Sequence, residues 1–92
     1  MRLLVTPTFE KAVKKLHLVE KADLDLAIRH IANDPQASAA KVGDLLGIYV
    51  CKFRMAKHPT LVAYRCFDDT IIKLLMIGNH ENFYRDLKRV KE

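Results

Sequence analysis

The spacing of apolar residues changes once along this chain, and that change limits the folds open to it. Up to about residue 32, apolar side chains recur every three or four positions, which is the period of a helix that buries one face. From Ile48 to Met55, every second residue is apolar and large (Tyr49, Cys51, Phe53, Met55), which is the period of a strand. The 92 residues are therefore expected to form a single α+β domain, 1–92, around one small core.

Turn and cap residues place the expected elements. We predict a strand over 2–6, a helix that opens at Thr6-Pro7-Thr8, and a second helix over about 21–32 that ends before Pro35. Strands follow over 48–55, 61–67 and 70–77, with a short strand and turn between Gly43 and Gly47. The last helix is expected over 81–91. The fold predicted is an N-terminal strand and helix hairpin packed on a three- to four-stranded antiparallel sheet, with a C-terminal helix.

The hairpin after Met55 predicts a cluster of cations. If residues 57–60 form a four-residue turn, Lys52 lies directly opposite Arg65, with Arg54 beside them. The same register pairs the apolar residues of the other face, Cys51 with Cys66, Phe53 with Tyr64 and Met55 with Val62. Like charges opposed across a strand pair repel each other, so their clustering indicates an anion site on the exposed face of the sheet. The alternative is that these long side chains diverge into solvent.

Positive charge is concentrated in the second half of the chain. Residues 1–44 carry seven cations and six acids, whereas residues 45–92 carry nine cations and five acids. The second half therefore contributes +4 of the net charge of +5. Between Leu45 and Phe67 there are four cations (Lys52, Arg54, Lys57 and Arg65) and no acid. This asymmetry favours a polyanionic partner, with an ordinary solvated surface as the alternative.

Several function classes are disfavoured by what the sequence lacks. No apolar run approaches the roughly 18 residues of a membrane span, and the first residues are too short an apolar stretch for a signal peptide. We therefore expect a cytoplasmic protein with no membrane role. Cys51, Cys66 and the four histidines have no zinc-ligand spacing, which predicts buried reduced thiols and neither a metal nor a cofactor.

His80 and Tyr84 lie four residues apart at the start of the last predicted helix. They would share one helical face, which Lys88 continues, while Phe83, Leu87 and Val90 face the core. An imidazole beside a phenol, close to cations and to a helix N-terminus, suits metal-free cleavage of RNA by its own 2′-OH. The alternative is that His80 only caps the helix and Tyr84 packs at its rim.

The order of these segments is similar to that of the RelE/ParE superfamily of toxins from type II toxin–antitoxin systems, and the Gly-x-His…Phe-Tyr segment looks most like the RelE, RelE/StbE and YafQ branches. The resemblance covers nearly the whole chain. The segments that carry it are Thr6-Pro7-Thr8-Phe9-Glu10-Lys11 with Lys14-Lys15-Leu16, Asn33-Asp34-Pro35, Gly43-Asp44-Leu45-Leu46-Gly47-Ile48-Tyr49, Lys52-Phe53-Arg54-Met55, Leu61-Val62-Ala63-Tyr64-Arg65 and the run Ile77 to Leu87.

The resemblance implies a toxin held inactive by a cognate acidic antitoxin, which cuts mRNA in the ribosomal A site and leaves a 2′,3′-cyclic phosphate and a 5′-OH. By that resemblance, the catalytic residues are His80 as the acid/base group, Tyr84 as the orienting or stacking residue, and Arg54 and Arg65 as cations at the phosphate. Lys52, Lys57 and Lys88 are expected to bind RNA. Where many members carry a basic residue before a Leu-Val-Tyr strand, this chain has Thr60 and Leu61.

Two other functions remain open from the sequence. A ParE-like member would poison DNA gyrase by binding it, without chemistry, although such members generally lack a His/Tyr pair. An inactive member would only bind its antitoxin.

Overall fold

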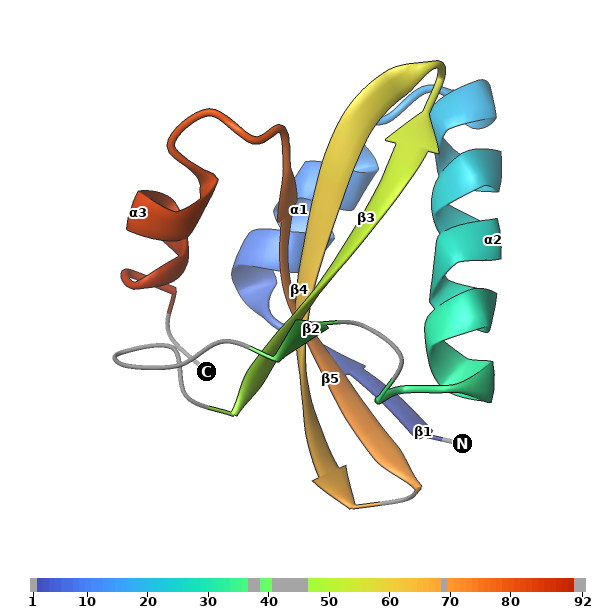
Figure 1. Cartoon of the computed structure of the whole chain (residues 1–92). Helices are drawn as coiled ribbons and strands as arrows, with labels where there is room; N and C mark the ends of the chain where they lie inside the picture. Colours follow the sequence, from blue (N-terminus) through green and yellow to red (C-terminus); the bar gives the residue numbers. More distant parts are fainter. Residues whose placement is uncertain (1, 37–38, 41–46, 69, 91–92) are drawn as a thin grey trace.

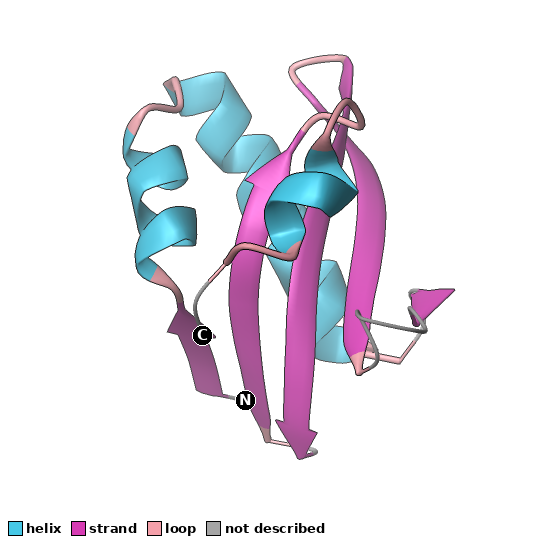
Figure 2. Cartoon of the chain, turned by 90° about the vertical axis from the view of Figure 1, so that its left-hand side faces the viewer, coloured by secondary structure: helices cyan, strands magenta, loops and turns pink. Residues whose placement is uncertain are grey.

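Two helices cover one face of a mixed β-sheet and a third helix lies on the opposite face (Figures 1 and 2). The computed structural model describes residues 2–36, 39–40, 47–68 and 70–90. The elements are β1 (Arg2–Val5), α1 (Pro7–Lys14), α2 (Leu18–Asn33), β2 (Ala39–Ala40), β3 (Ile48–Met55), β4 (His58–Asp68), β5 (Ile71–Gly78) and α3 (Phe83–Leu87). The predicted α+β class and helix hairpin are confirmed. The strand predicted between Gly43 and Gly47 falls mostly outside the described residues.

The sheet has the order β1-β5-β4-β3-β2. The central strands are antiparallel as predicted, but β1 runs parallel to β5, with Val5 beside Leu74. Thr6 holds this junction because its Oγ1 accepts from the N–H of Phe9 at 3.1 Å and donates to the carbonyl of Leu75 at 2.6 Å. The Thr6 side chain therefore caps α1 and ties it to the sheet.

A separate cluster of buried residues occupies each face of the sheet. The face covered by α1 and α2, here called the first face, contains Phe9, Leu24, Ile31, Cys51, Val62, Tyr64, Ile72, Leu74 and Ile77. The opposite or second face contains Ile48, Val50, Leu61, Ala63, Leu75 and Met76, with Phe83 and Leu87 of α3. The second face is thus partly covered, not fully exposed as the sequence analysis expected.

The β3–β4 hairpin has a two-residue turn, Ala56-Lys57, and both residues have positive φ, as type I′ turns require. The predicted register, based on a four-residue turn at 57–60, is therefore wrong. Lys52 lies opposite Leu61, Cys51 opposite Val62, Phe53 opposite Thr60 and Met55 opposite His58. The register differs by four positions, an even number, so every side chain keeps its predicted face.

The turn is held from α2. The carboxylate of Asp23 accepts a hydrogen bond from the backbone N–H of Ala56 at 2.8 Å. Positive φ costs a residue with a Cβ roughly 1–2 kcal/mol, and neither Ala56 nor Lys57 is a glycine or asparagine. The tertiary contact from Asp23 therefore stabilises a turn that its own residues disfavour.

We expect Ala56→Gly to raise the free energy of unfolding by about 1 kcal/mol, because glycine adopts positive φ without strain. Urea denaturation followed by circular dichroism would measure the change. Ala22→Gly, in the exposed part of α2, is the matched control and should lower stability by about 1 kcal/mol. A loss of stability in Ala56→Gly would contradict the strain argument.

At the other end of β4, Asp68 shapes the turn to β5. Its Oδ1 accepts from the hydroxyl of Thr70 at 2.7 Å and from the backbone N–H of Thr70 at 2.6 Å. These hydrogen bonds, the hydroxyl first, lower the pKa of Asp68 below its usual value. The stability they contribute is present above the unfolded-state pKa of an aspartate and is lost as pH falls through the lowered folded-state pKa.

Both cysteines are free thiols, but only Cys51 is buried as predicted, since Cys66 is partly exposed, and the two do not face each other. Cys51 is buried, and Cys66 lies opposite Ile72, where burial raises the pKa of its thiol. None of the helices in the described part of the chain has the length and apolar character needed to cross a bilayer.

Candidate functional site

One row of residues across three strands brings Lys52 and His80 together. Lys52 of β3 lies opposite Leu61 of β4, and Leu61 lies opposite Gly78 of β5. Because neighbouring strands are about 4.8 Å apart, the backbone of Lys52 is about 10 Å from that of Gly78. β5 ends at Gly78, and His80 is the second residue after it, so His80 lies just beyond the end of this row.

A pocket of about 210 Å³ lies where the row meets His80. Its lining residues are Lys52, Phe53, Pro59, Thr60, Leu61 and His80. Of these, the sequence analysis had singled out only Lys52 and His80 as site residues. Pro59 and Thr60 were assigned to the turn, whereas the two-residue turn places them in β4. Recognising that turn would have placed both of them beside β3.

The rings of His80 and Tyr84 meet edge to face, with centroids 6.0 Å apart and planes at 82°. This proximity confirms that the two side chains lie on the same side, although His80 is outside the helix. Helix α3 begins only at Phe83, after Asn82 at φ +60°, and has five residues, so the predicted helix over 81–91 is too long. His80 therefore precedes the helix by three residues and does not stand in its first turn, as the sequence analysis expected.

Phe83 connects the two rings to the core. It is 1% exposed and packs edge to face on Tyr84, with ring centroids 5.5 Å apart. It also lies over Gly78, where a Cβ, if present, would be 3.5 Å from the Phe83 ring. Tyr84 is half-buried against the second-face cluster. The exposed imidazole of His80 thus contacts the ring of Tyr84, which in turn contacts the buried ring of Phe83.

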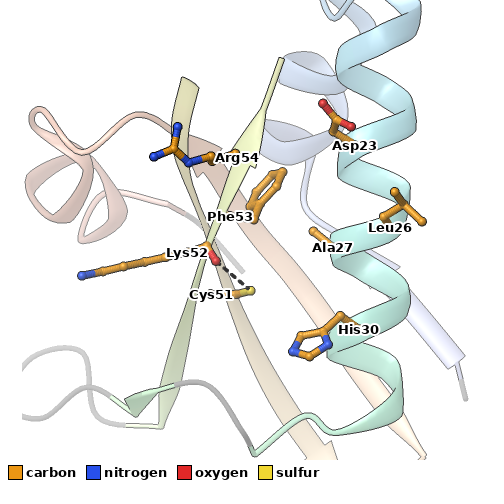
Figure 3. Close-up of a pocket in the computed structure, with 8 residues that line it drawn as sticks. All are labelled: Asp23, Leu26, Ala27, His30, Cys51, Lys52, Phe53 and Arg54. Carbon is orange, nitrogen blue, oxygen red and sulfur yellow. Dashed lines mark hydrogen bonds between the residues drawn. The ribbon is translucent and has the colours of Figure 1, made fainter. Parts of the chain in front are cut away.

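Arg54 lies on the same face of β3 as Lys52, two residues further along, and both side chains are exposed. They point away from α2, while Phe53 between them points toward it (Figure 3). Arg54 lies opposite Pro59, which lines the pocket. The second face thus places two exposed cations on the strand that borders the His80 pocket.

Arg65 does not join these cations. It lies opposite Ile48, four positions along β3 from Lys52, or about 13 Å. Its guanidinium lies against Gly47, where a Cβ would come within 2.7 Å of Nη1, and its partner on β5 is Lys73. Two cations do lie opposite each other across strands, but they are Arg65 and Lys73, a pair that the sequence analysis did not predict. The pairing of β4 with β5 shifts register at two places, so it could not be worked out from a regular alternation of residues.

The other two predicted RNA-binding residues, Lys57 and Lys88, are not among the residues that line this pocket. Lys57 is the second residue of the hairpin turn and is exposed, while Lys88 is exposed at the C-cap of α3. In the described part of the chain, no group of three or more His, Cys, Asp or Glu side chains could hold a metal ion.

Comparison with known families places the chain. The family model described as "ParE-like toxin of type II bacterial toxin-antitoxin system" matches residues 3–88. The chain belongs to this family of toxins. The superfamily predicted from the sequence motifs is therefore confirmed. Among curated proteins, none matches the chain significantly.

Solved structures show the same fold. The toxin chain in the crystal structure of the intact E. coli RelBE toxin–antitoxin complex superposes with a TM-score of 0.69 at 17% identity, over 87% of this chain and 96% of that one. A free-state mutant of E. coli toxin RelE gives a TM-score of 0.72 at 18% identity, over 90% and 86% of the two chains. At such identities, these neighbours establish the RelE-like fold alone.

Proposed function

We propose that this family member arrests translation by cutting mRNA on the ribosome, with His80 as the acid/base group. The observation that carries the proposal is the pocket shared by His80 and Lys52 on the second face, with Arg54 on the same strand as Lys52 and Tyr84 against the imidazole. Cations beside a titratable group are what phosphodiester cleavage requires.

In the proposed reaction, the ribose 2′-oxygen attacks the adjacent phosphorus and the bond to the 5′-oxygen breaks. A base takes the 2′-OH proton, and an acid supplies a proton to the leaving 5′-oxygen. The products are a 2′,3′-cyclic phosphate and a 5′-OH. His80, which is exposed at the pocket, would exchange one of these protons, while Lys52 and Arg54 would stabilise the charge gained at phosphorus.

The pocket indicates how the RNA would be oriented. Its volume of about 210 Å³ is below the roughly 300–1,000 Å³ of pockets for drug-sized ligands. It would therefore take one small group, such as a single base or sugar, against Pro59 and Leu61. Tyr84 would hold the imidazole edge to face and keep it directed to the scissile phosphate.

The proposal includes two macromolecular partners. One is the ribosome with its mRNA, whose phosphates match the excess of cations after residue 45. The other is an acidic antitoxin. The solved E. coli relative was crystallised as a toxin–antitoxin complex, which supports a partner of this kind for the present chain.

Primer extension on a cellular transcript after toxin induction would test the nuclease. Codon-phased cuts that require translation support it. Intact transcripts together with accumulating gyrase-dependent DNA breaks would instead support a gyrase poison. That second function is favoured by one observation, the ParE-like description of the matching family.

Arg54 and Arg65 form a matched pair for testing the site. We expect Arg54→Ala to lower mRNA cleavage about 10- to 100-fold, less than the roughly 10²–10³-fold cost of removing a buried oxyanion donor, because Arg54 is exposed. Arg65→Ala removes the same charge about 13 Å from Lys52 and should affect cleavage less. Cleavage of a defined mRNA in a purified translation system measures both. Equal losses in the two variants would argue for a general charge effect.

A further inference from the structure

We propose that the outer edge of β1 pairs with β1 of a second copy of this chain, antiparallel and about a two-fold axis, so that the two sheets join. The inference goes beyond the proposed function and does not depend on it. It names a second copy as the partner, the strand that binds it, and the register in which the two strands pair.

The backbone groups of β1 are divided between its two edges. The N–H groups of Arg2 and Thr6 donate to carbonyls on the β5 side, at 2.6 and 3.1 Å. Because successive residues of a strand direct their backbone groups to opposite edges, Leu3 and Val5 direct theirs away from β5. β1 is the outermost strand on its side of the sheet (Figure 2), and among the described residues it pairs only with β5. Leu3 and Val5 thus offer two N–H and two C=O groups to a further strand.

The side chains on this edge are apolar and only partly covered. Leu3 is 43% exposed and Val5 is 46% exposed. They lie beside Ile72 and Leu74, which belong to the buried cluster of the first face. Sheet edges are commonly protected by charge, proline or a bulge, but β1 carries a single charge, at Arg2, its first residue. A further strand would therefore extend the first-face cluster over both side chains.

The order of side chains makes this edge complementary to itself. When Leu3 lies opposite the partner subunit's Val5, the two-fold axis also places Val5 opposite the partner subunit's Leu3. All of these residues direct backbone groups into the interface, so each pair exchanges two hydrogen bonds, as in an antiparallel ladder. Their four apolar side chains lie together on the first face, since opposed residues share a face of the sheet.

The charges on this edge favour a second copy over an acidic segment. In the self-paired register, Arg2 lies opposite the partner subunit's Thr6, which is uncharged. The two copies of Arg2 are then four residues apart along the strands, about 13 Å, so no like charges are opposed. An acidic strand would instead place carboxylates against Leu3 and Val5, where no cation compensates their lost hydration.

The size of the interface predicts a weak dimer that leaves the His80 pocket accessible. A strand of four residues spans about 13 Å. The area buried should therefore fall below the roughly 1,200 Å² at which stable complexes begin. The pocket is lined by residues of β3 and β4 with His80, and β5 lies between β4 and β1 in the sheet. Each copy thus keeps its own site.

The first test is a concentration series of the full chain, followed by sedimentation equilibrium and NMR. We expect the average mass to rise from one chain towards two between about 10 μM and about 1 mM. Over the same series, the amides of Leu3 and Val5 should gain protection from hydrogen exchange. The amides of Arg2 and Leu4, which bond to β5, should change little.

Cysteine variants test the register, in a Cys66→Ser background that removes the partly exposed native thiol. Leu4 would lie opposite the partner subunit's Leu4 in a non-hydrogen-bonded pair, with Cα atoms about 4.5 Å apart, which a disulfide can span. Mild oxidation of Leu4→Cys should therefore link two chains. Leu3→Cys is the matched control, because its two copies would lie diagonally, roughly 8 Å apart, beyond the reach of a disulfide.

A pair of double variants tests the self-complementarity. Leu3→Lys with Val5→Lys opposes like charges in both pairs and should raise the dissociation constant of the dimer at least about tenfold. Leu3→Lys with Val5→Glu places opposite charges in the same pairs and should still dimerise at low salt. Leu26→Glu, at a 64% exposed position on α2, should leave the dimer unchanged.

Three results would overturn the inference. The first is a chain that stays monomeric up to about 1 mM. The second is a dimer that Leu26→Glu dissociates or that Leu3→Cys links as readily as Leu4→Cys, because its interface would lie elsewhere or in another register. The third is protection of the Leu3 and Val5 amides only after an antitoxin is added, which would assign this edge to that partner.

Discussion

Cells that express His80→Ala are expected to grow normally under induction, with mRNA cleavage reduced about 10²- to 10⁴-fold, the usual contribution of general acid–base catalysis. The imidazole is the titratable group at the pocket that Lys52 lines, and the ring of Tyr84 contacts it. His80 is exposed, so its removal should leave the fold intact. Growth curves and primer extension measure the effect, and thermal denaturation verifies folding.

His30→Ala is the matched control for this loss. His30 is also exposed, but it lies on α2, on the other side of the sheet. It should keep full cleavage and toxicity. If His80→Ala cut mRNA at the rate of the unmodified chain, the acid/base assignment would be wrong, and ribosome geometry would have to supply the proton transfers.

Phe83→Ala is expected to lower the free energy of unfolding by about 3–5 kcal/mol, the range for truncating a buried aromatic side chain. Phe83 is 1% exposed and is the residue that packs α3 over Gly78 at the end of β5. Its loss should also free Tyr84, which contacts both Phe83 and His80, so cleavage should fall with stability. Urea denaturation and the translation assay measure the two effects.

Two further variants separate these effects. Phe67→Ala removes the same side chain where it is 55% exposed and should change stability by no more than about 0.5 kcal/mol. Phe83→Leu keeps an apolar side chain over Gly78 and should recover part of both losses. A destabilised Phe83→Ala that cleaves mRNA at the normal rate when folded would show that α3 does not position the imidazole.

The elements that the sequence predicted well are those whose burial repeats with a clear period. In α2, apolar residues recur every three or four positions at Leu24, Ala27, Ile28 and Ile31, and all of these except the half-buried Ile28 are buried. The start of that helix was missed because Leu18 and Val19 are exposed and add nothing to the buried stripe. The first turn is held instead by the side chain of Glu20, which accepts the N–H of His17 at 2.9 Å.

The candidate site was predicted in part. His80 and Tyr84 are in contact, and Lys52 and His80 line one pocket, whereas Arg65 lies elsewhere. The row Lys52–Leu61–Gly78 depends on how three strands align, and strand spacing in sequence does not determine that alignment. The last helix was overestimated because Val90 continues an apolar period beyond the end of α3.

What the sequence by itself determined is the order of the elements and the face on which each side chain lies. Alternation sets the face of Lys52 and Arg54, and an error of four positions in register leaves that face unchanged. What only the tertiary structure decided is which cations meet His80. That outcome depends on the turn at Ala56 and Lys57, two residues that disfavour positive φ. The turn is held by a hydrogen bond that the Ala56 N–H donates to the carboxylate of Asp23, which lies on α2, 33 positions earlier in the chain. Local preference opposes this turn, so a contact between distant segments had to select it.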